Sequence, residues 1–222
     1  MDNDEQTEAV LFDNDGVLVD SETLFFETTR AAFRRLDVDL TREVWGRRYL
    51  GEGNSSREVA LCLGADPKRL DGVLEERNGE FRRLLQKAPP LRPFVRETLT
   101  KLHGVVKLAI VTGGGRDHLA LVHATSNLLP CFEVIITRDD CSKGKPHPEP
   151  YLAAIRMLGV HAGNSIAVED TPRGLASARA AEIPCVVVPT ELTRMLPFPG
   201  ALAVEPNLAC VLRHIRPRRT IR

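Results

Sequence analysis

Five short runs of β-branched and other apolar residues recur along this chain, each bounded by turn-forming residues. Runs of this length and composition are typical of buried strands. They lie at Ala9–Phe12 and in the segments that end at Thr112, Thr137, Asp170 and Val188. Between the later runs the sequence predicts helices at Arg116–Ser126, Pro150–Leu158 and Gly174–Ala181. Because strands that alternate with helices form a parallel sheet, we expect an α/β fold with a Rossmann-like parallel core.

The segment from about Ser21 to Ala88 has a different pattern. It is rich in Arg, Glu and Leu, and its apolar residues recur at helical spacing, as Leu24, Ala31 and Leu36 do. The first strand is apolar enough to need neighbouring strands, and only the later sequence supplies them. We therefore expect an all-helical cap at 21–88, inserted after the first strand into a core made of 1–20 and 89–222, with the prolines at 89 and 90 marking the return.

The net charge of the chain limits the kinds of partner that it can bind. The chain has 30 Lys and Arg against 30 Asp and Glu, which gives a net charge of zero. Nucleic-acid affinity depends on clustered positive charge, so we expect a small molecule as the partner and no nucleic acid. No apolar run approaches the roughly 18 residues of a membrane span, and the first residues are acidic. We expect a cytoplasmic protein with no membrane partner, and a monomer is our default.

Acidic residues gather at the ends of two predicted strands. The first strand runs directly into Asp13-Asn14-Asp15-Gly16, and a later one ends at Glu169-Asp170. The carboxyl ends of parallel strands share one edge of a sheet, where ligands bind. Four acids on one rim would repel each other strongly, and a divalent cation with oxygen ligands resolves that repulsion. Mg²⁺ is the usual ion beside a phosphate, so the sequence predicts a Mg²⁺ site at Asp13, Asp15, Glu169 and Asp170.

Two further strand ends supply groups that bind anions. Thr112 offers a hydroxyl, and Gly113 and the two glycines after it offer backbone N–H groups ahead of a helix. Lys145, between Gly144 and Pro146, brings a positive charge. Together with a metal, these groups are what phosphoryl transfer requires. No recognisable His, Cys or Ser nucleophile motif lies at this rim, so the natural nucleophile is an aspartate, with the second aspartate as proton donor and acceptor.

The order of these motifs resembles one family. DNDGVLVDSE after the first strand, Thr112 after another, Gly-Lys-Pro around Lys145 and then VEDTPRG are similar to the four ordered motifs of haloacid dehalogenase-like hydrolases. The likeness is to the branch with a helical cap after the first motif, and it covers nearly the whole chain. It implies that Asp13 is the nucleophile and Asp15 the general acid/base, with Thr112 and Lys145 binding the phosphoryl group.

The resemblance also implies a set of metal ligands. Mg²⁺ would be held by the Asp13 carboxylate, the Asp15 backbone carbonyl and Asp170, with Glu169 nearby. The helical insert would be a lid that closes over substrate and excludes water. Asn14 stands where an apolar residue is common in the family, and the sequence offers no role for it.

The family branch contains phosphatases and phosphomutases. We expect a Mg²⁺-dependent phosphatase of a small phosphorylated metabolite, a sugar phosphate first among them, acting through an aspartyl-phosphate. The alternative is a β-phosphoglucomutase-like enzyme. The Ser56-Arg57 pair resembles the mutase loop for a distal phosphate, whereas Phe25 stands where the mutase has a histidine. Arg57 and Arg116 are the candidate contacts for the rest of the substrate.

Two other classes share part of this pattern. A receiver-type signalling module also combines clustered Asp, Mg²⁺, Thr and Lys, but it needs only about half this length and places its phosphorylated Asp on a middle strand. A C–Cl hydrolase of the same family does not need the metal-binding arrangement of Asp15 and Asp170. Both are therefore less favoured than a phosphatase.

Overall fold

The core is a single sheet in which all six strands run parallel. The fold is described from a computed structural model and covers residues 6–87 and 91–217. The strands are β1 (Ala9–Phe12), β2 (Lys107–Val111), β3 (Val134–Ile136), β4 (Ser165–Glu169), β5 (Cys185–Val187) and β6 (Ala203–Val204). Their order across the sheet is β3-β2-β1-β4-β5-β6. This arrangement confirms the predicted α/β fold and all five predicted strands, and adds the short edge strand β6.

The strand order places β1 at a switch point. From β1 the chain moves outward through β2 and β3, then returns to pair β4 with the other side of β1. In open α/β sheets, ligands bind outside the carboxyl ends of the strands at such a point. Phe12 pairs with Ile110 of β2 and Val168 of β4, so the residues that follow these three strands meet at one edge.

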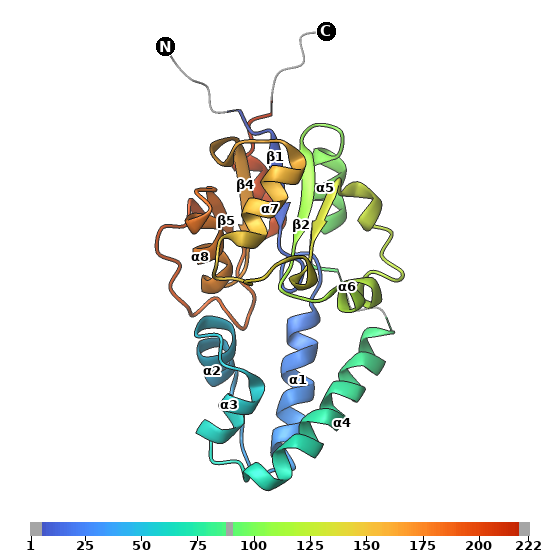
Figure 1. The fold of residues 1–222 in the computed structure, drawn as a ribbon, viewed down its shortest axis with the longest axis vertical. Coiled ribbons are helices and arrows are strands. Elements are labelled where there is room, and N and C mark those ends of the chain that lie inside the picture. Colours follow the sequence, from blue (N-terminus) through green and yellow to red (C-terminus); the bar gives the residue numbers. More distant parts are fainter. Residues whose placement is uncertain (1–5, 88–90, 218–222) are drawn as a thin grey trace.

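Helices cover both faces of the sheet (Figure 1). One face packs against α5, α6 and α9, and the other against α7 and α8. The core helices are α5 (Val95–Leu102), α6 (Arg116–Val122), α7 (Glu149–Leu158), α8 (Pro172–Ala180) and α9 (Leu208–Val211). Every residue of β1 is completely buried between these layers. Within the described parts of the chain, no helix combines the length and apolar character that crossing a membrane requires.

The segment after β1 is helical and projects from the carboxyl edge of the sheet (Figure 1). Its elements are α1 (Ser21–Arg34), α2 (Arg42–Val44), a π-helical segment (Trp45–Gly51), α3 (Ser56–Cys62) and α4 (Pro67–Leu85). They enclose their own apolar cluster, which includes Phe26, Phe33 and Trp45. An inserted helical unit was predicted here, whereas its predicted end at residues 88 and 89 lies outside the described residues, so the exact division remains a prediction.

Candidate active site

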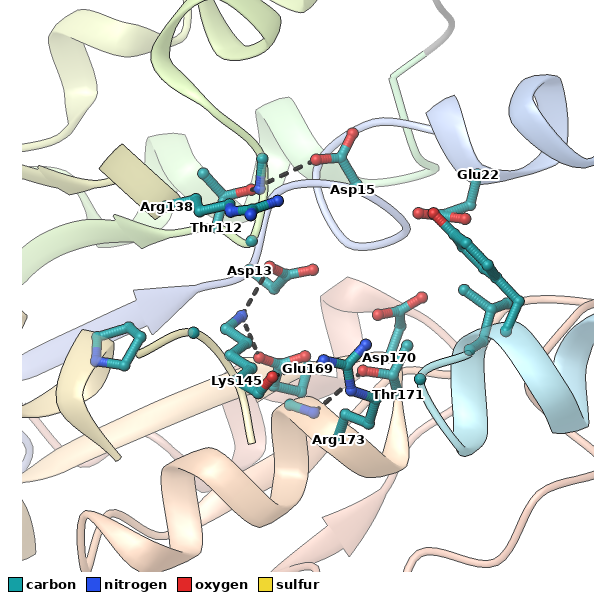
Figure 2. Close-up of a pocket in the computed structure, with 18 of the residues that line it drawn as sticks. Asp13, Asp15, Glu22, Thr112, Arg138, Lys145, Glu169, Asp170, Thr171 and Arg173 are labelled. Atoms are coloured by element: carbon teal, nitrogen blue, oxygen red, sulfur yellow. Dashed lines mark hydrogen bonds and ion pairs between the residues drawn. The ribbon is translucent and has the colours of Figure 1, made fainter. Parts of the chain in front are cut away.

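A polar cavity of about 830 Å³ lies where the carboxyl edge of the sheet faces the helical insert. Asp13 follows β1, Thr112 follows β2, and Asp170 follows β4, and all three line this cavity. Lys145 joins them from the loop before α7. Figure 2 shows these side chains converging from separate elements. The structure thus brings together the residues that the sequence analysis placed at the strand ends.

Lys145 is the cation at the centre of this cluster. Its Nζ lies 2.8 Å from Asp13 Oδ1, 2.5 Å from Glu169 Oε1 and 2.8 Å from the Val111 carbonyl oxygen. Burial opposes the charge of Lys145, but the two neighbouring carboxylates outweigh it and raise its pKa. Lys145 therefore remains charged at physiological pH. The Tyr151 hydroxyl donates a 2.6 Å hydrogen bond to the same Glu169 oxygen and so helps to hold that carboxylate in place.

Asp13 is poised close to its ionisation point. Only 8% of the surface of Asp13 is exposed. Burial raises the pKa of Asp13 to about 7, with Glu169 and Asp15 adding to the rise and Lys145 opposing it. The carboxylate is the nucleophilic form, so a further positive charge beside Asp13 would favour the reactive state.

The acidic cluster fits a hard divalent cation. Asp13, Glu169 and Asp170 each present an oxygen, and these oxygens lie within 4.8 Å of one another. Both carboxylate oxygens of Asp170 are buried with no hydrogen-bond partner among the described residues, and so is Glu169 Oε2. Burial and the charge of Asp13 raise the pKa of Asp170 well above its ordinary value. Buried carboxylate oxygens without donors are what a Mg²⁺ site offers, so these residues fit the predicted ion.

Asp15 is held by donors on both of its oxygens. Oδ1 accepts a hydrogen bond from the Ser21 hydroxyl and lies 2.8 Å from His118 Nε2. Oδ2 accepts from Asn14 Nδ2 at 3.2 Å and from Thr112 Oγ1 at 3.4 Å. Burial would raise the pKa of Asp15, but His118 and the other donors lower it to about 2. The carboxylate is therefore ionised in this arrangement.

The loop after β2 brings Thr112 and the glycines to the cavity. Thr112 is 2% exposed, and its hydroxyl also accepts a 3.0 Å hydrogen bond from the Gly114 backbone N–H. A Cβ at Gly114 would lie 2.8 Å from the His118 ring, so a larger residue there would have to displace that ring. Gly113 lines the cavity, and nothing lies within 4 Å of the place where its Cβ would stand.

The structure does not bring two of the predicted substrate contacts to the cavity. Arg57 is partly exposed and forms an ion pair with Asp71 on α4. The preceding Ser56 accepts a hydrogen bond from the buried Arg77. Ser56 therefore faces the interior of the helical insert, and Arg57 faces its outer surface. Arg116 is also exposed and pairs with Asp140. The position of Arg57 removes the one sequence feature that favoured a phosphomutase.

Several cavity residues were not singled out from the sequence. Glu22, His118 and Arg173 line the cavity, and each lies in the first turn of a helix that begins beside it. Burial raises the pKa of Glu22 to about 8, and the charges of Asp15 and Asp13 add to that rise. A first-turn position after a functional strand end was the available signal, because the first turn of such a helix points back at the sheet edge.

Other missed residues come from a loop, from a single 3-10 turn (Arg138–Asp140) and from the π-helical segment. Tyr49, Arg138 and Asn54 line the cavity, and the labelled Arg138 and Arg173 lie on opposite sides of Asp13 in Figure 2. Loops carry no periodic pattern that predicts which side chain faces inward. These positions therefore needed coordinates.

Comparison with known proteins decides the family. The model of the haloacid dehalogenase-like hydrolases matches residues 7–182, which include every candidate catalytic residue. The chain belongs to the haloacid dehalogenase-like hydrolase family. The resemblance drawn from the four ordered motifs is thereby confirmed.

Individual relatives of this hydrolase include one that is named as a phosphatase. Protein CbbY from a plasmid of Cupriavidus necator is 30% identical over 90% of this chain and 85% of its own length. A phosphorylated carbohydrates phosphatase of Thermotoga maritima is 31% identical over 79% of this chain and 82% of its own. The crystal structure of CbbY from Rhodobacter sphaeroides in complex with phosphate superposes with a TM-score of 0.70 at 26% identity, covering 92% of this chain and 96% of that one. The protein is therefore a phosphoric monoester hydrolase.

Proposed function

We propose that this hydrolase is a Mg²⁺-dependent phosphatase of a small phosphorylated carbohydrate, with Asp13 as the nucleophile. The observation that carries the proposal is the cluster at the sheet edge. It combines a buried nucleophilic carboxylate, a cation 2.8 Å from that carboxylate, and buried acidic oxygens without donors. Such a set binds a phosphoryl group and neutralises its charge, which is most of what phosphoryl transfer requires.

The residues divide the reaction between them. A carboxylate oxygen of Asp13 attacks phosphorus, and the bond from phosphorus to the substrate oxygen breaks. Asp15 is ionised in the free enzyme, so it must take up a proton when the anionic substrate binds, and it gives that proton to the leaving oxygen. Water then attacks the aspartyl-phosphate, its proton passes to the Asp15 carboxylate, and inorganic phosphate leaves. Thr112, the Gly113 amide and Lys145 bind the phosphoryl oxygens. Asp13, the Asp15 carbonyl and Asp170, with Glu169 nearby, would hold Mg²⁺, which would supply charge neutralisation.

The carbohydrate part of the proposal rests on the residues of the helical insert that line the cavity. We assign 21–88 the role of a cap, and its residues Glu22, Tyr49, Asn54 and Ser55 line the cavity. Carboxylate, phenol, amide and hydroxyl groups match the hydroxyls of a sugar or polyol. A cavity of about 830 Å³ has room for such a molecule. The names of relatives that act on phosphorylated carbohydrates point the same way.

Phosphate release from a substrate panel tests this proposal. The panel holds hexose and hexitol monophosphates, phosphoglycolate and nucleoside monophosphates, each assayed with Mg²⁺ and with EDTA. We expect release that requires Mg²⁺ and is highest with a carbohydrate phosphate. Asp13→Asn should abolish it, whereas the matched change Asp39→Asn, at an exposed position, should leave it intact. Full activity of Asp13→Asn, or equal activity in EDTA, would contradict the mechanism.

A further inference from the structure

Asn14 does not line the substrate cavity, although it lies between two residues, Asp13 and Asp15, that do. The chain bends at Asn14, just after β1. Its side chain is completely buried and reaches His123 at the end of α6, a helix of the face that also holds Phe12. A buried amide in apolar surroundings is costly unless all its polar atoms are hydrogen-bonded. The partners of Asn14 therefore indicate what it does.

Those partners form a continuous chain that ends on Asp15. Asn14 Nδ2 lies 3.2 Å from Asp15 Oδ2, and Asn14 Oδ1 lies 2.7 Å from His123 Nε2. His123 Nδ1 lies 2.8 Å from Ser126 Oγ, which also accepts a 3.2 Å hydrogen bond from the Leu128 backbone N–H. His123 and Ser126 are buried, with 5% and 7% of their surfaces exposed. We call Asn14, His123 and Ser126 the buried polar chain.

The Asp15 end of the buried polar chain fixes the direction of its hydrogen bonds. The Asp15 carboxylate can only accept, so Asn14 donates to it through Nδ2 and accepts through Oδ1 from the proton on His123 Nε2. Burial lowers the pKa of His123 and so favours its neutral form, in which Nδ1 carries no proton and accepts from the Ser126 hydroxyl. That hydroxyl accepts from the Leu128 N–H, and its proton also lies within reach of the His123 backbone carbonyl, at 3.4 Å.

The loop does not need this side chain for its shape. The backbone carbonyl of Asn14 already accepts hydrogen bonds from Leu18 at 2.8 Å, Val19 at 3.1 Å and Val17 at 3.3 Å. An apolar side chain could fill the same buried space without needing partners. The contact of the amide with Asp15 is what distinguishes asparagine at this position.

We propose that the buried polar chain positions Asp15 for catalysis. This inference rests on the proposed phosphatase function and names Asn14, His123 and Ser126 as positioning residues, since none of them lines the cavity. His123 ends α6, and His118 in the first turn of the same helix contacts the other Asp15 oxygen. Helix α6 therefore holds both oxygens of the carboxylate, one directly and one through His123 and Asn14.

The two half-reactions provide a way to isolate Asp15. With p-nitrophenyl phosphate, Asp13 attacks phosphorus and p-nitrophenolate leaves with the bonding electrons, without needing a proton. Hydrolysis of the aspartyl-phosphate still needs Asp15 to take the proton from water. A misplaced Asp15 should therefore slow the second step and spare the first, whereas a general loss of structure should slow both.

Stopped-flow release of p-nitrophenolate in the presence of Mg²⁺ tests the proposal on the full chain. For His123→Leu we expect the first turnover to remain within about twofold of the wild type while the steady-state rate falls roughly tenfold, a part of the 10²–10⁴-fold that general acid–base catalysis contributes. His123→Gln, which can still donate to Asn14, should recover most of that loss. Ser126→Ala, at the far end, should show the same pattern more weakly. Asp15→Asn gives the limiting pattern, and the exposed His161→Leu should match the wild type.

Several results would overturn the proposal. Unchanged steady-state rates in His123→Leu would show that Asp15 does not depend on the buried polar chain. An equal fall in both phases, accompanied by a lower melting temperature and no rescue by His123→Gln, would assign the chain to stability alone. If instead the wild type released no p-nitrophenolate and no phosphate from any substrate, the proposed function itself would fail, and the positioning role with it.

Discussion

Replacing Asp13 with asparagine should stabilise the metal-free protein at high pH. The ordinary pKa of an aspartate is 3.8, and burial raises that of Asp13 to about 7. Below about pH 4 both the folded and the unfolded chain hold the proton, so Asp13 costs no stability there. As pH rises toward 7 the unfolded chain loses its proton first, and the folded state becomes progressively less stable. The difference between 3.8 and about 7 corresponds to about 4 kcal/mol.

Asn at position 13 cannot ionise, so the variant does not lose unfolding free energy in this way as pH rises. In EDTA at pH 9 we expect Asp13→Asn to exceed the wild type by up to about 4 kcal/mol in free energy of unfolding, or about 8–16 °C in melting temperature for a chain of this size. Near pH 4 the two proteins should be nearly equal.

Urea unfolding and calorimetry across this pH range, in EDTA and in Mg²⁺, measure the effect. Mg²⁺ should stabilise the wild type at high pH and narrow the difference. Asp39→Asn, the same chemical change on the surface, should follow the wild type throughout. Parallel curves for Asp13→Asn and the wild type from pH 4 to 9 would refute the reasoning.

Three further changes test other contacts. Saturating Mg²⁺ should raise the wild-type unfolding free energy by about 2.7 kcal/mol at a hundred times its Kd, and Asp170→Asn should lose most of that rise in a thermal-shift titration; an undiminished rise would count against Asp170 as a ligand. Tyr151→Phe removes the 2.6 Å hydrogen bond to Glu169, and should lower the unfolding free energy by about 1.5–3 kcal/mol; a change below about 0.5 kcal/mol would make that bond unimportant. Gly53 has a φ of +80°, and a Cβ there would lie 2.9 Å from the Arg173 guanidinium. Gly53→Ala should therefore lower the free energy of unfolding, measured with urea, by about 1–2 kcal/mol. Adding Arg173→Ala should recover only the part of this loss that comes from crowding against Arg173. An unchanged urea midpoint in Gly53→Ala would contradict this.

The strand ends were predictable because parallel strands share one edge. Asp13, Thr112 and Asp170 each follow a strand that reads as apolar in the sequence, and register alone brings them together. Strand β6 was not predicted, since the two residues Ala203–Val204 are too short to show a pattern. Helix α5 (Val95–Leu102), in the part assigned to the core, was also not predicted.

The inward residues of loops and helix ends were not predictable in the same way. The helix predicted at Arg116–Ser126 ends at Val122, because His123 and Ser126 turn inward to the buried asparagine. That contact joins residues more than a hundred positions apart, so no local pattern reveals it. Arg57 illustrates the opposite case: a capping box between Ser55 and Glu58 sets the start of α3 and leaves Arg57 on its outer side, against Asp71.

The central claim, that Asp13 carries the phosphoryl group, has one direct test. Asp15→Asn removes the base for the second step, so this variant should accumulate the intermediate when mixed with substrate and Mg²⁺. Acid quenching within the first turnover, digestion and mass spectrometry of the peptides locate the phosphate. We expect a phosphoryl group on the peptide that contains Asp13, absent from Asp13→Asn and from samples in EDTA. Turnover that proceeds with no phosphorylated peptide, or with phosphate on a different residue, would contradict it.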